Sequence, residues 1–346
     1  MADYSPTDRL LHRLALSSHG VRRLSLDMER ALMKPDGGPD RSVCVTGLAR
    51  AGTTALMRAL CGSGHFASLT YADMPFVLAP NLWARLSRFN QRTRRRRQRA
   101  HADGVEVDYD SPEAFEEVFW QLELGDYPLE AGGLIPQVVP PEVVDSYQAY
   151  QQMICRRYAA TRYLAKNNNQ VLRLASLAPQ TPETTYLVVF RDPLEQALSL
   201  LNQHRRFAHA DRFTREYMRW LGHFEFGATH RPMHLSDPSV SEAHGVPPDP
   251  DSVEYWLFQW INVYTYVHDL LDQANGNIWL VAYERLCDHP ETWLQVCDLA
   301  GIPPSESAFR RAGTRSDASQ PDPRLLDRAK AIYASLNARS VGSIGA

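Results

Sequence analysis

The sequence predicts an α/β fold with a mainly parallel central sheet flanked by helices, of the P-loop-like, nucleotide-binding kind. Three short apolar runs, at 42–46, 185–190 and 277–282, predict buried strands. A glycine-containing turn and then a helical pattern follow the first run, which is how a nucleotide-binding α/β unit begins. The long intervals at about 70–160 and 205–275 are predicted to be helical insertions.

The elements follow in order along the chain. Leucines at helical spacing over 8–33 predict one amphipathic helix, and the turn-rich KPDGGPDR segment follows it. We therefore expect an N-terminal helix and linker over 1–40 and a single domain over 41–346. The arginines of the first helix leave contact with a membrane or a partner open, although a docked helix is favoured. Further on, 253–273 predicts a long aromatic-rich helix, and 290–338 is predicted to be helical with breaks at prolines.

Composition excludes several classes of protein. With 346 residues, 44% hydrophobic residues and a formal net charge of −3, the chain is neither disordered as a whole nor a globally basic nucleic-acid binder. The five cysteines lack zinc-ligand spacing, so we expect reduced thiols and no metal. No uncharged apolar run reaches the roughly 18 residues of a membrane span, and the first 33 residues do not resemble a signal peptide. These features favour a cytoplasmic protein.

The most informative segment is Gly47-Leu-Ala-Arg-Ala-Gly-Thr-Thr54. A G-x-x-x-x-G frame between a strand and a helix is typical of a loop that binds phosphate through backbone N–H groups. In ATP- and GTP-dependent P-loop enzymes a lysine follows this frame, but here Thr53 follows and the cation, Arg50, lies inside the loop. The missing lysine argues against phosphoryl transfer. A P-loop nucleotide kinase and a non-catalytic nucleotide- or polyanion-binding protein are kept as alternatives.

Two motifs resemble sulfotransferases that use 3′-phosphoadenosine 5′-phosphosulfate (PAPS). Arg50-Ala-Gly-Thr-Thr54 resembles the family's P-R-S-G-T-T loop, although the Pro and the Ser are Ala49 and Ala51 here. Arg191-Asp-Pro-Leu-Glu-Gln-Ala-Leu-Ser199 resembles the family's R-D-P-x-x-x-x-x-S motif. The family's C-terminal G-x-x-G-x-x-K loop is not recognisable, and the basic segment 309–313 is the nearest substitute.

The resemblance implies which residues bind the donor and which act in the reaction. Residues that would hold the 5′-phosphosulfate are Arg50, Ala51, Gly52, Thr53 and Thr54. Residues that would hold the 3′-phosphate are Arg191 and Ser199, while Tyr283, from a Tyr-Glu pair, would lie near the adenine. Arg50 and Lys166 would neutralise charge that develops during transfer.

The proton acceptor is harder to assign. Many small-molecule sulfotransferases have a histidine two residues after the lysine, where this chain has Asn168, an amide that cannot take a proton. In other branches of the family an acidic base lies about twenty residues past this loop. Asp73, among aromatic and apolar neighbours, matches that position and is our predicted base. His65, His101 and Asp108 are the alternatives.

We therefore expect PAPS as co-substrate, no metal, and a small-molecule, lipid or carbohydrate acceptor whose hydroxyl, in preference to an amine, receives the sulfuryl group. Adenosine 3′,5′-bisphosphate would be released. No nucleic-acid partner and no membrane span are expected, and a homo-oligomer is left open. The arginine-rich run Arg92–Arg99 favours a solvated segment, with binding of nucleic acid, a membrane or a polyanionic acceptor as the alternatives.

Overall fold

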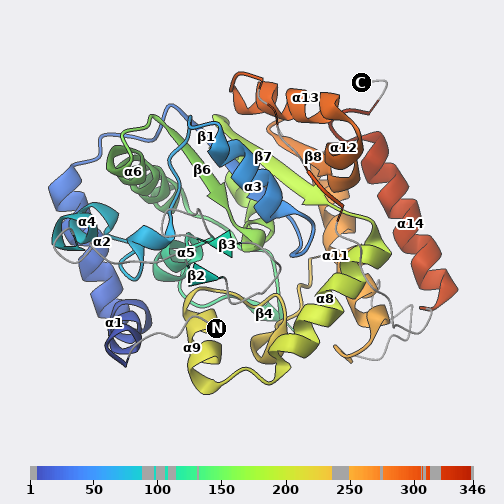
Figure 1. Cartoon of the computed structure of the whole chain (residues 1–346), viewed down its shortest axis with the longest axis horizontal. Helices are drawn as coiled ribbons and strands as arrows, with labels where there is room; N and C mark the ends of the chain where they lie inside the picture. Colours follow the sequence, from blue (N-terminus) through green and yellow to red (C-terminus); the bar gives the residue numbers. More distant parts are fainter. Residues whose placement is uncertain are drawn as a thin grey trace.

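A four-stranded parallel sheet forms the centre of the structure, a computed structural model that describes residues 6–87, 97–98, 106–107, 114–130, 132–235, 249–272, 276–304, 306, 309–311 and 321–343 (Figure 1). The strand order is β6 (Arg162–Lys166), β1 (Arg41–Thr46), β7 (Thr184–Phe190), β8 (Ile278–Ala282). All three neighbouring pairs are parallel. The predicted α/β class is confirmed, and β1, β7 and β8 lie where the three apolar runs predicted strands, whereas β6 was not among them.

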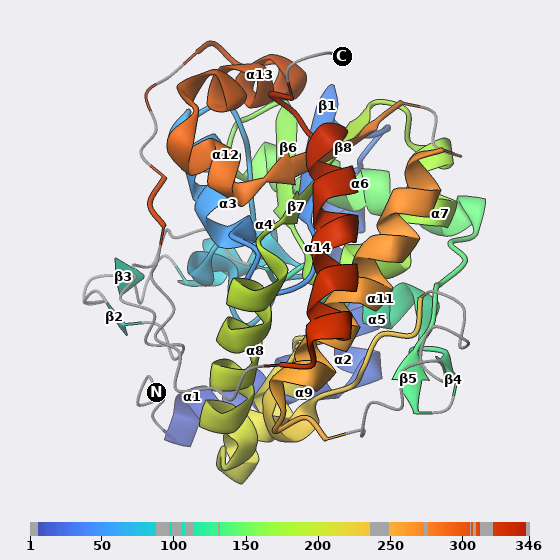
Figure 2. The same ribbon diagram turned by 90° about the vertical axis from the view of Figure 1, so that its right-hand side faces the viewer.

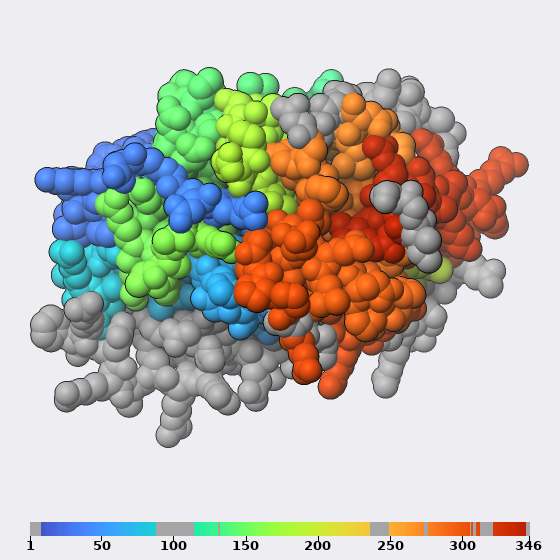
Figure 3. All heavy atoms as spheres, turned by 90° about the horizontal axis from the view of Figure 1, so that it is seen from above, coloured from blue at the N-terminus to red at the C-terminus, as the bar shows by residue number. Residues whose placement is uncertain are grey.

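Both faces of the sheet are buried, as the continuous apolar runs require. Alternate residues of β1 belong to different hydrophobic clusters: Val43 and Val45 to one, Cys44 to the other. The first cluster includes side chains of α3 (Thr53–Gly62), α12 (Tyr283–Asp288) and α13 (Pro290–Ala300). The second includes side chains of α6 (Pro141–Arg157), α11 (Val253–Leu271) and α14 (Pro323–Ala338). The ribbons of α11 and α14 lie next to each other in the side view (Figure 2). On the surface, atoms of the α12–α13 segment (orange) adjoin those of the α3 segment (light blue) (Figure 3).

The strand order creates a crevice at the carboxyl edge of the sheet. β1 pairs with β6 on one side, where Val45 is opposite Lys166, and with β7 on the other, where Thr46 is opposite Val188. The helix after β1, α3, packs on one face, whereas the helix after β7, α8 (Pro193–Ala208), packs on the opposite face. Ligands of open α/β sheets bind where successive connections diverge in this way.

The N-terminal segment forms two helices, α1 (Pro6–Ser17) and α2 (His19–Met33), and our prediction of one helix is wrong. Ser18 is extended, with φ −90° and ψ 115°, and its hydroxyl accepts a hydrogen bond from the backbone N–H of Val21. A serine in this position starts a new helix because it satisfies an N–H group that lacks an intrahelical partner. Leu26 of α2 belongs to the same buried cluster as Cys44 of the sheet.

The two long insertions are mainly helical in the parts that the structure describes. They contain η1 (Tyr71–Asp73), α4 (Pro80–Ser87), α5 (Glu117–Leu124), α6, α9 (Arg212–Trp220), η5 (Gly227–Thr229) and α11, with short strand pairs β2 (Arg97–Gln98) with β3 (Glu106–Val107) and β4 (Leu129–Glu130) with β5 (Gly133–Leu134). Between β6 and β7 lie η3 (Asn168–Leu172), α7 (Leu174–Leu177) and η4 (Ala178–Gln180). Among the described helices, none combines the length and apolar character needed to span a bilayer.

Candidate functional site

The loop between β1 and α3 depends on two glycines. Gly47 has φ +129°, and a Cβ there would lie 2.3 Å from the carbonyl oxygen of Val189 in β7. Gly52 has φ +102°, and a Cβ there would lie 2.2 Å from the ring of Tyr283. Side chains are therefore excluded at both positions, by backbone conformation and by contact. The loop reaches α3 with its backbone close to Tyr283, the residue that the resemblance places near the adenine.

Arg50 joins the two sequence motifs. It occupies the left-handed region, with φ 69°, which is uncommon for a residue with a side chain. Its Nε–H donates a hydrogen bond of 3.0 Å to Oγ of Ser199, a half-buried residue of α8. The strand-to-helix loop and the helix of the second motif thus meet at the carboxyl edge of the sheet, although 149 positions separate the two residues.

The side chain of Gln196, one turn before Ser199 on α8, links this helix to the loop after β1 and to α11. Its Nε2 donates to the carbonyl oxygens of Leu48 and Ala49, at 3.1 and 3.0 Å. Its Oε1 accepts from Nε1 of Trp260 in α11 at 3.1 Å, and the same indole N–H lies 3.2 Å from the carbonyl oxygen of Arg191. Gln196 and Trp260 are fully buried. Buried hydrogen bonds therefore connect the loop to the start of α8, and both polar atoms of the Gln196 amide have partners.

Arg191 lies between β7 and α8 and is 7% exposed. Its Nε and Nη2 donate to Oε2 of Glu195, at 3.1 and 2.5 Å, while the Glu195 side chain is 45% exposed. Asp192 begins α8 by accepting a hydrogen bond from the backbone N–H of Glu195 at 3.0 Å. A planar guanidinium held at a strand end in this way suits a phosphate monoester.

Lys166 is the last residue of β6 and is buried, with 6% exposure. The next residue, Asn167, starts η3: its side chain accepts a hydrogen bond from the backbone N–H of Asn169 at 3.0 Å, as the sequence predicted for this cap. Asn168 accepts from the hydroxyl of Thr53 through Oδ1 at 3.3 Å and donates through Nδ2 to Oε1 of Glu225 at 3.1 Å. The segment after β6 therefore touches the phosphate loop directly.

A buried ion pair supports this segment. Arg173 donates to both carboxylate oxygens of Glu117, at 2.9 and 2.6 Å, and the two side chains are 0% and 4% exposed. Burial opposes the charge of Arg173, but the charge and hydrogen bonds of Glu117 outweigh it and raise the pKa of Arg173. Glu117 also accepts a hydrogen bond of 2.6 Å from Nδ2 of Asn167. The position of the residue after Lys166 is thus set by a charge pair in the core.

The structure gives Asp73 a different set of contacts. Its Oδ2 accepts from the backbone N–H of Thr70 at 2.9 Å and from the hydroxyl of Tyr158 at 2.6 Å, and its Oδ1 lies 3.9 Å from Nε of Arg157. Burial raises the pKa of Asp73, with partial opposition from the Tyr158 hydrogen bond. Thr70 and Asp73 form the capping box of η1. Arg157 and Tyr158 come before the first residue of β6 in the chain, whereas Lys166 is its last residue. A role for Asp73 as base stays a prediction that these contacts do not support.

The alternatives to Asp73 do not join the site in the described parts of the chain. His65 is exposed and follows the end of α3 opposite to the phosphate loop. His101 and Asp108 lie outside the described residues, as does the Arg92–Arg99 run apart from the backbone of β2.

Two contacts bring further segments to the site. The hydroxyl of Tyr283 donates to the carbonyl oxygen of Arg310 at 3.0 Å, so the segment named in the sequence as a substitute for the family's C-terminal loop lies beside the 47–54 loop. The sequence did not indicate Glu225 and His223: Glu225 accepts from Asn168, and its Oε2 lies 3.5 Å from Nδ1 of His223. Their positions in a turn between α9 and η5 carried no signal in the sequence, because no local pattern relates them to the loop.

No protein-family model matches the chain, and no curated protein matches it in sequence. Its structure is similar to that of the sulfotransferase STF9 from Mycobacterium avium, with a TM-score of 0.50 and 13% sequence identity over 97% of this chain and 86% of that chain. For the sulfotransferase STF1 from Mycobacterium tuberculosis H37Rv the TM-score is 0.48 and the identity 15%, over 96% of this chain and 82% of that one. The chain has the α/β fold of the Mycobacterium avium sulfotransferase.

Proposed function

We propose that the protein is a sulfotransferase that moves a sulfuryl group from PAPS to an acceptor hydroxyl, in preference to an amine, and releases adenosine 3′,5′-bisphosphate. The observation that carries the proposal is the 3.0 Å hydrogen bond between Arg50 and Ser199. This hydrogen bond joins the 47–54 loop, which suits a 5′-phosphosulfate, to the 191–199 segment, which suits a 3′-phosphate. A nucleotide with a phosphate group at each end of its ribose matches two such anion sites.

The donor would bind through both of these sites. The 5′-phosphosulfate would lie on the N-terminus of α3, where the backbone N–H groups of 51–54 and the hydroxyls of Thr53 and Thr54 favour an anion. Arg50 would turn from Ser199 to the same group. Arg191 and Ser199 would take the 3′-phosphate, and Tyr283, whose ring borders Gly52, would contact the adenine.

The reaction would be an in-line displacement without a metal or a covalent enzyme intermediate. The acceptor oxygen forms the new bond to sulfur while the bond between sulfur and the bridging oxygen breaks, and the leaving phosphate takes the electron pair. Lys166 and Arg50 would stabilise the charge on the sulfuryl and leaving oxygens. Thr53 stands where a P-loop kinase would have its lysine, and its hydroxyl bonds Asn168 at 3.3 Å, which weighs against phosphoryl transfer.

Titration calorimetry tests the donor site without knowledge of the acceptor. We expect adenosine 3′,5′-bisphosphate to bind at least about tenfold more tightly than AMP. Arg191→Met should weaken the bisphosphate by about 1.5–3 kcal/mol, the range for a hydrogen bond to a charged group, and leave AMP unchanged. Equal affinity for the two nucleotides would contradict the proposal.

The acceptor is then sought with ³⁵S-labelled PAPS and a panel of hydroxyl compounds that covers small molecules, lipids and carbohydrates. Label should appear in at least one product, and the transfer should fall in the Lys166→Met variant. Phosphoryl transfer from Mg-ATP in place of sulfuryl transfer would favour the kinase alternative.

A further inference from the structure

The side chain of Asn168 connects the phosphate loop to a carboxylate. Its Oδ1 lies 3.3 Å from the hydroxyl of Thr53, and its Nδ2 lies 3.1 Å from Oε1 of Glu225. Asn168 follows Lys166 by two residues, at the position where many small-molecule sulfotransferases have a histidine. The amide cannot accept a proton, but the group to which it donates can.

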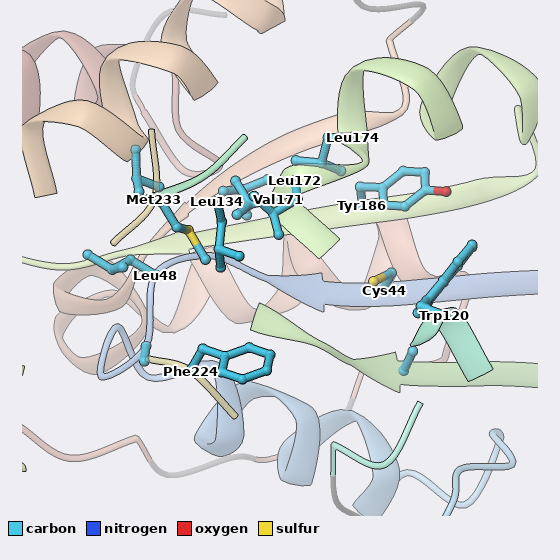
Figure 4. Close-up of a cluster of buried hydrophobic side chains, with 14 of the residues drawn as sticks. Cys44, Leu48, Trp120, Leu134, Val171, Leu172, Leu174, Tyr186, Phe224 and Met233 are labelled. Carbon is cyan, nitrogen blue, oxygen red and sulfur yellow. The ribbon is translucent and has the colours of Figure 1, made fainter. Parts of the chain in front are cut away.

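The side chain of Glu225 is buried beside Asn168 and the loop after β1. It is 7% exposed, and its second oxygen, Oε2, lies 3.5 Å from Nδ1 of His223. It also lines a cavity of about 10 Å³ together with Leu48 of the phosphate loop. Figure 4 shows Leu48 beside Met233 and Leu134, two further apolar residues of that lining.

The charged groups around Glu225 come from several elements. Lys166 at the end of β6 is its cationic neighbour, and the ring of His223 after α9 lies beside it. Arg231 and His230, from the segment after η5, line the same cavity. Burial raises the pKa of Glu225, but the charge and hydrogen bond of His223 and the charge of Lys166 outweigh it and lower the pKa to about 2. Burial lowers the pKa of His230 to about 4, so this ring is neutral at neutral pH. Glu225 is therefore a carboxylate.

We propose that Glu225 accepts the proton of the acceptor hydroxyl, with Lys166 and His223 as its charge partners. This inference rests on the proposed sulfuryl transfer. In the step, the acceptor O–H bond breaks and its proton moves to the Glu225 carboxylate, the oxygen bonds to sulfur, and adenosine 3′,5′-bisphosphate leaves with the electron pair. No further reactant is needed.

Donor binding makes Glu225 a better base. Without the donor, the charge of Lys166 and the hydrogen bond of His223 stabilise the carboxylate and oppose its protonation. When the anionic 5′ end of the nucleotide pairs with Lys166, that charge is neutralised, and the pKa of Glu225 rises toward the range in which a general base is effective. The chain thus acquires its base only when the nucleotide is bound.

Carbon-13 NMR of the protein labelled at the glutamate carboxyl carbon tests this coupling. The Glu225 resonance is assigned by its loss in Glu225→Gln. Saturating adenosine 3′,5′-bisphosphate should raise the pKa of Glu225 by at least one unit, and Lys166→Met should raise it without nucleotide. A pKa that stays unchanged in both experiments would overturn the proposal.

Kinetics supply the second readout. Using ³⁵S-labelled PAPS with the acceptor found in the panel, Glu225→Gln should lower kcat by about 10²–10⁴-fold, the usual contribution of a general base. Nucleotide binding that raises the pKa of Glu225 by one unit must favour the uncharged side chain about tenfold, so Glu225→Gln should bind the bisphosphate about tenfold more tightly. Glu225→Asp should restore part of the rate. Glu291→Gln is the matched control. Glu291 also follows a histidine, His289, by two positions, and its Oε1 lies 3.3 Å from Nδ1 of that histidine, but both side chains are exposed.

The outcomes separate the two proposals. If the protein binds the bisphosphate no better than AMP, the proposed function fails, and the role of Glu225 fails with it. If donor binding and transfer are both normal in Glu225→Gln, the sulfotransferase assignment stands and Glu225 is not the base.

Discussion

Gly52 shows how a single residue constrains the candidate site. Its backbone has φ +102°, and the ring of Tyr283 occupies the space of a Cβ. The loop can therefore approach the ring, and a bound nucleotide, only without a side chain at this position. The glycine that the loop shares with phosphate-binding loops is thus required here by backbone conformation and by the Tyr283 ring.

Gly52→Ala should destabilise the protein by about 1–3 kcal/mol, the range for strained backbone and overpacking, and weaken adenosine 3′,5′-bisphosphate binding. Urea unfolding and calorimetry measure the two effects. Gly62→Ala, at the other end of α3 where a Cβ would meet no atom within 4 Å, is the control and should be neutral or stabilising. Equal behaviour of the two variants would contradict this role for Gly52.

Arg191 is ion-paired with Glu195 where a 3′-phosphate would bind. Glu195→Gln removes the competing carboxylate, and we expect the affinity for adenosine 3′,5′-bisphosphate to rise by about two- to fivefold, since a partly exposed ion pair is worth up to about 1 kcal/mol. Calorimetry with AMP, whose affinity should not change, is the control. A loss of bisphosphate affinity would mean that Glu195 orients Arg191 and does not compete for it.

At the scale of secondary-structure elements, one buried amide joins β1's loop to α8. Gln196 donates to the carbonyl oxygens of Leu48 and Ala49 and accepts from Trp260. Because these partners are buried, they have no water to replace Gln196. The relative position of the two proposed anion sites therefore depends on a side chain that is proposed to bind neither phosphate.

Gln196→Leu should reduce the advantage of adenosine 3′,5′-bisphosphate over AMP by at least about fivefold, because small displacements of binding groups are costly. Affinity for AMP should change less, since the 5′-phosphate contacts the loop alone. Gln203→Leu, a buried position two turns later on α8, controls for general loss of an amide. If both variants lose affinity for the two nucleotides equally, Gln196 is only a stabilising residue.

At the scale of the whole molecule, stability should depend on pH through the core carboxyl Glu116. Burial raises its pKa from 4.5 to about 7, against opposition from Tyr147 and Arg173. The folded state then keeps a proton that the unfolded state releases between pH 4.5 and pH 7. The free energy of unfolding should therefore fall as pH rises through this window, by up to about 1.4 kcal/mol per pH unit from this group.

Urea unfolding of the wild type and Glu116→Gln over pH 4.5–7.5 measures this effect. The difference in unfolding free energy between the two proteins should shift in favour of Glu116→Gln as pH rises, and level off above about pH 7. A difference that is constant with pH would show that Glu116 titrates normally in the folded protein.

Much of the fold could be predicted because its signals are local. Apolar runs between turns identified β1, β7 and β8, and the glycine spacing identified the loop after β1. The break at Ser18 was missed because leucine spacing continues across it, and only the cap geometry separates α1 from α2. Strand order was not predictable from these runs, since pairing of β1 with both β6 and β7 is set by contacts distant in sequence.

The candidate site was predictable only where a motif carries it. Arg50 and Ser199 come from two motifs, and the structure brings them together. Glu225 was not found because it lies 57 positions from Asn168 in a turn without a pattern. Asp73 is predicted as the base because it matches the position of an acidic base in other branches of the family that the chain resembles. Its hydrogen bond with Tyr158 joins segments distant in the chain, so no local pattern in the sequence indicates it.

A crystal structure of the protein with adenosine 3′,5′-bisphosphate tests the central claim most directly. We predict a single nucleotide across the carboxyl edge of β1 and β7, its 5′-phosphate on the loop at Arg50 and its 3′-phosphate on Arg191 and Ser199. A nucleotide bound elsewhere, or one that contacts Arg50 while Arg191 stays paired with Glu195 and faces away from it, would contradict the account.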